Sequence, residues 1–249
     1  MKNNIIKRES WWNGIGNEQY MQADLSDHTF YQKTKKEQSK NLLLIGLAAL
    51  ALNVIVLLVS IYTGWYLLVI FTFAITLSII APFFDTPNMV KRGKLDYYSS
   101  LFLAENEKEG VINIHGGTLF DYYFVIDRRL NGQQRTNLII QKFVEGLLNL
   151  SKSYKANDPQ VKVMGTSYIL NERTLKKAGF TVVKTDFLQY AILIWNYFNL
   201  TLSLSIAKAK LTFPDIRKVV TFEADLNSLL KRKAFLESLN ERLETAPAV

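Results

Sequence analysis

The sequence predicts a membrane protein: a two-helix transmembrane hairpin, then a cytosolic α/β (α+β) domain with a mixed sheet, then a helical C-terminal part. Three observations predict this class. Two long apolar runs lie in the first third of the chain. The region after them alternates strand-like and helix-like patterns, which is typical of an α/β order. The last part carries apolar residues at helical spacing.

The two apolar runs predict membrane-spanning helices. Residues 42–62 are uncharged and almost entirely apolar, and residues 65–84 repeat the pattern after Thr63-Gly64. About 20 helical residues cross a hydrocarbon core of roughly 30 Å. A signal peptide is the alternative for the first run, but this run is too long, starts too late and is followed at once by another span. We therefore expect a hairpin with the lipid bilayer as partner.

Basic residues near the span ends predict the orientation of the hairpin. Lysines precede the first span, Lys91, Arg92 and Lys94 follow the second, and the connection between the spans has no cation. Cationic residues favour the cytoplasmic side. We expect both termini in the cytoplasm and the hairpin in the cytoplasmic (inner) membrane.

The net charge of +8 suggests an anionic neighbour. A basic face near an anionic leaflet explains it, at about 1 kcal/mol for each well-placed cation. Nucleic acid is the alternative. We do not expect it, because the cations are scattered and no basic run has interleaved aromatic residues.

Composition divides the chain into five parts, and the second span is expected to end near Pro82 to Pro87. Trp11 and Trp12 predict a docking element or an interfacial anchor. The expected parts are an N-terminal segment at 1–40, the hairpin at 41–84, a linker at 85–94, the α/β domain core at 95–185, and a helical C-terminal part at 186–249 that packs on the domain or the membrane surface.

Local patterns predict the elements of the domain. Two strands should flank a charged turn that closes at Gly110, and residues 118–126, β-branched and aromatic on both parities, should form a buried strand. The remaining expected elements are a helix at 135–153, a strand at 159–169, a short helix at 170–177 and a strand at 181–185.

Two helical patterns follow the domain core. Residues 187–207 are apolar but interrupted by Gln189, Asn196 and Asn199, which favours a helix in the interface or on the sheet over a third span. Residues 222–244 repeat leucines at helical spacing. They predict an amphipathic helix, with pairing to a second copy as one use of its stripe.

The stretch "DRRLNGQQRTN", residues 127–137, joins the predicted strand to the predicted helix. Arg129, Gly132, Gln134 and Arg135 are its candidate cofactor-binding residues, because a helix N-terminus attracts anions. The alternative is a turn and cap, with Asn131 as N-cap and Gln134 completing a capping box. Both remain open.

Residues 111–185 resemble the central core of GNAT-type acyltransferases. Arg129, Gly132 and Gln134 occupy the three positions of the family pattern (Gln/Arg)-x-x-Gly-x-(Gly/Ala), and Gly179-Phe180 closes the following short helix. The resemblance implies a cofactor, acetyl-CoA or another acyl-CoA, held at the start of the helix. If the chain is an enzyme, the implied activity is acyl-CoA-dependent N-acyltransfer.

Four further residues are weaker catalytic candidates. His115, beside two glycines, is either a base or the cap of a tight turn. Asp121 lies in the predicted buried strand, where a carboxylate needs a partner. The available cations are Arg128, Arg129, Arg135 and Arg173. The pair would be either structural or part of a catalytic site. Tyr168 and Asn171, with Ser167, lie at a strand end, where α/β sites gather. With two histidines and no cysteine, we expect no metal site.

These patterns leave three functional hypotheses. The first is a membrane-anchored cytosolic domain that binds a ligand or partner. The second is a two-span effector whose hairpin forms a homo-oligomer, as a pore or by membrane disruption, under control of the domain. The third is a subunit of a larger membrane complex. We do not expect an enzyme from these patterns.

Overall fold

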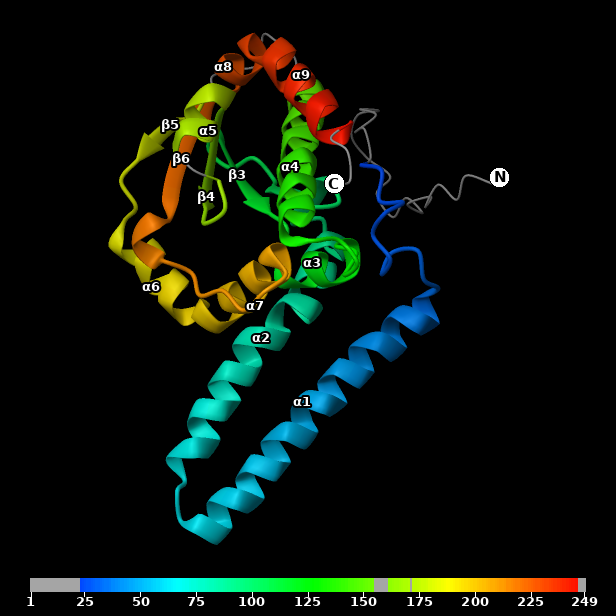
Figure 1. Ribbon diagram of the computed structural model, residues 1–249, viewed down its shortest axis with the longest axis vertical. Coiled ribbons are helices and arrows are strands. Elements are labelled where there is room, and N and C mark those ends of the chain that lie inside the picture. Colours follow the sequence, from blue (N-terminus) through cyan, green and yellow to red (C-terminus); the bar gives the residue numbers. More distant parts are fainter. Residues whose placement is uncertain (1–22, 155–160, 171, 246–249) are drawn as a thin grey trace.

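A computed structural model describes residues 23–154, 161–170 and 172–245. Two long helices form a hairpin that leads into an α/β domain (Figure 1). Trp11, Trp12 and Asn171, which the sequence singled out, lie outside the described residues.

The hairpin consists of α1 (Lys35–Thr63) and α2 (Leu67–Lys91). Thr34 and Glu37 form a capping box at the start of α1, and Gly64 ends it with a φ of 76°, a left-handed conformation that glycine adopts without steric cost. Both helices are long and apolar enough to cross a membrane. The predicted helical hairpin is confirmed as a pair of long apolar helices.

The second helix does not end near Pro82 to Pro87, as the sequence predicted, but runs through both prolines to Lys91. Most of the predicted linker at 85–94 is therefore helical. Phe83 and Thr86 are buried, so the end of α2 is held by packing against the domain. This packing outweighs the loss of helical hydrogen bonds at the prolines.

A mixed six-stranded sheet forms the centre of the domain, in the order β1-β2-β3-β4-β6-β5. The pair β3–β4 is parallel and all the others are antiparallel. The strands are β1 (Leu95–Ser99), β2 (Phe102–Glu105), β3 (Val111–Gly116), β4 (Lys162–Ser167), β5 (Thr181–Val183) and β6 (Val220–Asp225).

The helices α4 (Gly132–Ser153), α5 (Glu172–Ala178), α8 (Leu226–Lys231) and α9 (Lys233–Glu244) supply the other side of the main core. Phe102, Ile112 and Phe222 of the strands pack against Leu147 of α4 and Leu229 of α8. Helix α4 and strand β2 approach closely at Gly146, where a Cβ would lie 2.3 Å from the Phe102 ring.

The predicted strand at 118–126 is wrong, since residues Leu119–Val125 form helix α3. Thr118 and Asp121 make a reciprocal capping box that starts this helix. Apolar residues occur on both parities because the short helix is covered on several sides, by α2, by α7 (Tyr197–Lys208) and by the segment around Phe30. An all-apolar run does not distinguish such a helix from a buried strand.

The C-terminal part also departs from expectation. Residues 187–207 form two helices, α6 (Phe187–Trp195) and α7, bent by 72° at Asn196. The single helix predicted at 222–244 is wrong, because residues up to Asp225 form β6 inside the sheet, after a 3₁₀ turn at Ile216–Lys218.

The leucine stripe of the C-terminal part is used within the chain. Leu226, Leu229 and Leu236 are buried in the domain's own core, so these three do not face a second copy. Because β6 lies between β4 and β5, the domain core extends beyond the predicted boundary at residue 185.

Candidate functional site

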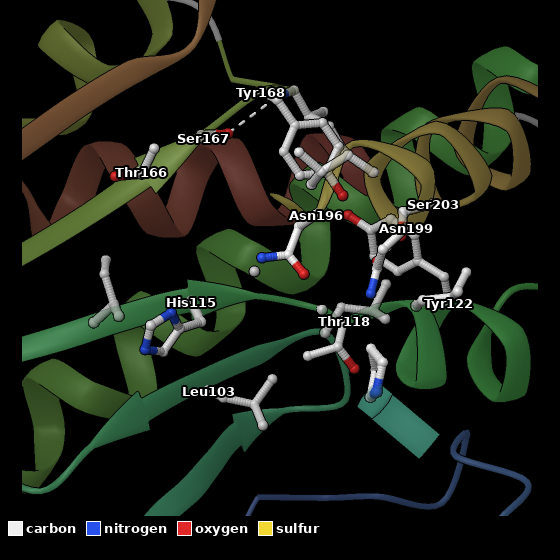
Figure 2. A pocket seen from close by; sticks show the side chains of 18 of the residues that line it. Leu103, His115, Thr118, Tyr122, Thr166, Ser167, Tyr168, Asn196, Asn199 and Ser203 are labelled. Carbon is white, nitrogen blue, oxygen red and sulfur yellow. Dashed lines mark hydrogen bonds between the residues drawn. The ribbon is translucent and has the colours of Figure 1, made fainter. Parts of the chain in front are cut away.

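A cavity of about 420 Å³ lies at the carboxyl ends of the parallel strands β3 and β4. Its walls come from the sheet, α2, the start of α3, and the corner between α6 and α7. Ligands of open α/β sheets bind beyond these strand ends. His115 and Tyr168, two of the predicted site residues, both line this cavity (Figure 2).

One end of the cavity carries charge. His115 Nε2 lies 3.2 Å from Glu105 Oε1, and the Asn113 amide donates to Glu105 Oε2 at 3.3 Å. Asp85 of α2 also lines the cavity. Among the described residues of the lining there is neither lysine nor arginine. The site therefore offers carboxylates and an imidazole to a ligand, without a permanent cation.

The other end carries hydroxyls and amides. Burial raises the pKa of the Tyr122 phenol well above its ordinary value, and interaction with Tyr168 raises it further. Burial also raises the pKa of Tyr168, while hydrogen bonds from Tyr122 and Ser203 oppose the shift. Ser203 Oγ donates to Asn199 Oδ1 at 3.4 Å. At neutral pH both phenols are protonated and neutral.

Local sequence explains how these groups reach the cavity. Gly117 admits the Tyr122 ring, because a Cβ there would lie 2.8 Å from it, whereas nothing lies within 4 Å of a Cβ on Gly116. Ser167 Oγ accepts from the amides of Ile169 and Leu170 at 3.2 and 2.9 Å, which turns the chain at the end of β4 and directs Tyr168 to the cavity (Figure 2).

Asp121 lies outside this cavity, fully buried at the start of α3. It accepts from the Thr118 amide and hydroxyl at 2.7 and 2.8 Å, and from the Tyr97 hydroxyl. Its basic neighbour is His28, at 3.2 Å from Nε2 to Oδ1. The prediction of an arginine partner is wrong, because helix α3 directs the Asp121 carboxylate toward the segment that contains His28.

The stretch at 127–137 forms the predicted turn and cap. Asn131 Oδ1 accepts from the amides of Gln133 and Gln134 at 2.9 and 3.0 Å, and Gln134 Oε1 accepts from the Asn131 amide at 2.9 Å. The Arg129 side chain is 91% exposed and pairs with Asp127 at 2.6 Å, which lowers the pKa of that carboxyl to about 2. The capping box is confirmed.

Arg135 and Gly132 join this turn to α7. The Arg135 guanidinium donates to the carbonyls of Leu130, Arg128 and Ile206 at 2.8, 2.6 and 2.8 Å. A Cβ on Gly132 would lie 2.3 Å from the Lys208 carbonyl oxygen. At the predicted cofactor-binding positions, the Arg129 side chain already donates to Asp127, the Arg135 side chain to backbone carbonyls, and the Gln134 backbone amide to Asn131.

Sequence reasoning missed several residues of the cavity. Asn196, Asn199, Ser203 and Thr118 all line it. The signal was present in the polar residues that interrupt the apolar run at 187–207, which argued against a third span but were not assigned to a site.

The sequence matches no protein-family model, no curated protein and no solved structure. The chemistry of the cavity and its place beside the hairpin are therefore the basis for a functional proposal.

Proposed function

We propose that the protein is a membrane-anchored cytosolic α/β domain that binds a small ligand in the cavity at the ends of β3 and β4. One observation carries the proposal. The spanning helix α2 and the sheet both contribute walls to the same cavity, so a bound ligand touches the membrane anchor and the cytosolic domain at once.

The size and lining of the cavity support binding of a small molecule. Ligand pockets usually have volumes of roughly 300–1,000 Å³ and are mainly apolar with a few placed polar groups. Here Leu103, Leu193 and Leu200 supply apolar walls, while His115 and Tyr168 supply polar groups.

The charge of the lining favours a ligand without phosphate. Acyl-CoA carries several phosphates, which proteins bind with arginine, lysine or free backbone amides. The described lining lacks arginine and lysine, and the amides of Gln133 and Gln134 are already bonded to Asn131. We therefore propose binding of a phosphate-free ligand in place of acyl transfer.

Native mass spectrometry of the full chain, released from non-ionic micelles with n-dodecanol, tests the proposal. We expect one saturable dodecanol per chain. Gly116→Phe should abolish retention, because Gly116 lines the cavity and its Cβ position has room for a larger side chain. Thr181→Phe, on the exposed edge strand, is the matched control and should retain dodecanol. Equal retention by wild type and Gly116→Phe would show that the cavity is not the binding site.

A further inference from the structure

The corner between α6 and α7 is attached to α2 within its apolar run. Ser78 Oγ donates to the Trp195 carbonyl at 3.3 Å, and Asn199 Nδ2 donates to the Ser78 carbonyl at 3.2 Å. Ser78 lies about 16 Å along α2 from Leu67 at 1.5 Å per residue. In a hydrocarbon core of roughly 30 Å, this position is below the membrane surface.

The outer surface of α6 suits the same environment. None of its residues is buried, and its apolar side chains are largely exposed. These side chains are Phe187, Leu188, Ile192, Ile194 and Trp195, from 52% to 87% exposed. The α6–α7 corner lies beside α2 (Figure 1), so the lipid tails that would surround α2 would also cover this surface of α6. An interfacial helix buries its apolar face in this way.

The carboxylates of the cavity lie apart from the α6–α7 corner. That corner is uncharged and lines the cavity with Ile192, Leu193 and Leu200 beside Asn196, Asn199 and Ser203, while Asp85 lies about 10 Å further along α2 than Ser78. Glu105 approaches the charged end from the sheet. Asp85 forms no ion pair within the described part of the chain.

We infer that the cavity takes a single-chain amphiphile with a cationic amine head, which enters from the leaflet on the domain's side of the bilayer. Ile192, Leu193 and Leu200 of the uncharged end contact the tail, and Glu105 and Asp85 face the head. This orientation is the one an amphiphile already has in that leaflet. The inference rests on the proposed function and specifies its ligand class.

Competition among three probes with the same tail tests the head group. Dodecylamine, n-dodecanol and dodecyl phosphate are offered together to the full chain in non-ionic micelles, and retention is read by native mass spectrometry. We expect dodecylamine to be retained tenfold or more over dodecyl phosphate, because a charge-assisted hydrogen bond is worth about 1.5–3 kcal/mol. The double variant Asp85→Asn, Glu105→Gln should lose most of this preference, and Glu107→Gln, outside the lining, should keep it.

The outcomes separate the two proposals. Dodecyl phosphate could compete as well as dodecylamine, while Gly116→Phe still abolishes the retention of dodecanol. In that case the inferred head group is wrong and the cavity remains a binding site. If Gly116→Phe lowers the retention of none of the three probes, the proposed function itself fails. In nanodiscs, dodecylamine with a photoreactive tail end should label α2 or α6–α7. Labelling confined to α5 and α9, which do not line the cavity, would overturn entry from the bilayer.

Discussion

Asn199 donates its side-chain amide to the carbonyl oxygen of Ser78 at 3.2 Å, and that oxygen is the one that Pro82 leaves without a helical donor. Proline lacks the N–H that would bond four residues back, so the Ser78 carbonyl needs a partner from outside the helix. Ser78 in turn donates to the end of α6. Helix α7 thus repairs α2 at its proline, and the two elements are held in one arrangement.

A double-mutant cycle at these positions measures the repair. Asn199→Leu should lower the free energy of unfolding by about 1–3 kcal/mol, the cost of a buried acceptor left without a donor. In a Pro82→Ala background the helix supplies its own N–H to Ser78, so the same substitution should cost less. Thermal or denaturant unfolding of the four proteins in detergent gives the coupling. Additive effects would show that Asn199 stabilises the chain through other contacts only.

The close approach of α4 to α7 at Gly132 gives a second prediction. Alanine is normally the better helix residue, by roughly 0.5–1 kcal/mol. Gly132→Ala should nevertheless destabilise the protein by about 1–3 kcal/mol, because its Cβ would collide with the Lys208 carbonyl. Gly116→Ala, with open space around its Cβ, should be nearly neutral. A neutral Gly132→Ala in unfolding measurements would show that the two helices are not in contact there.

The buried carboxylate of Asp121, at the start of α3, gives a third prediction. Asp121→Ala removes a helix cap and leaves His28 and Tyr97 without their common partner, so we expect a loss of about 3 kcal/mol or more. Asp186→Ala, which removes only the cap of α6, should cost about 1 kcal/mol. Denaturant unfolding compares the two. Equal losses would mean that the contact with His28 contributes nothing beyond the cap.

Sequence alone predicted the features that depend on local spacing. The hairpin follows from the length of two apolar runs, and the capping box at Asn131 and Gln134 follows from their separation by three residues. Helix α4 and the strand β4 that follows it were predicted from periodicity in the same way.

The features that were missed depend on distant segments. Residues 118–126 looked like a strand because nothing local shows that α2, α7 and the Phe30 segment cover a helix from several sides. The cavity needs α2, β3, β4 and the α6–α7 corner together, and no spacing within one of them predicts that assembly. His115 and Tyr168 were identified by residue type, but their position in the lining of one cavity was not predicted.

The tyrosines of the cavity give a dependence on alkaline pH. Burial raises the folded-state pKa of Tyr122 and Tyr168 above the unfolded value of about 10. Their contribution to stability is complete below pH 10 and is lost as pH rises toward the folded values. Thermal unfolding between pH 8 and pH 11 should therefore show a falling stability above pH 10, and the double variant Tyr122→Phe, Tyr168→Phe should fall less steeply.

Tyr31, Tyr97 and Lys142 add to the same alkaline loss, so the double variant should keep a residual slope. Burial raises the pKa of the Tyr31 and Tyr97 phenols above their ordinary value. Burial lowers the pKa of Lys142, but Asp27 and Glu145 raise it more, and the net shift is upward. Tyr190→Phe, on α6, controls for the added phenylalanine. If the wild type and the double variant lose stability in parallel above pH 10, the two phenols do not account for the effect.

The depth of the α6–α7 corner is open to direct measurement through Trp195. Its side chain is 72% exposed, and its carbonyl accepts from Ser78 of α2. In a chain with Trp11, Trp12 and Trp65 replaced by phenylalanine, bilayers of brominated phosphatidylcholine should quench Trp195 strongly, whereas aqueous acrylamide should quench it weakly. As a control, Thr181→Trp places a single tryptophan on the exposed strand β5 of a chain in which Trp195 is replaced as well. Acrylamide should quench that tryptophan strongly, and brominated lipid should quench it weakly. Strong acrylamide quenching of Trp195 would place the corner outside the bilayer, and the amphiphile would then need another route to the cavity.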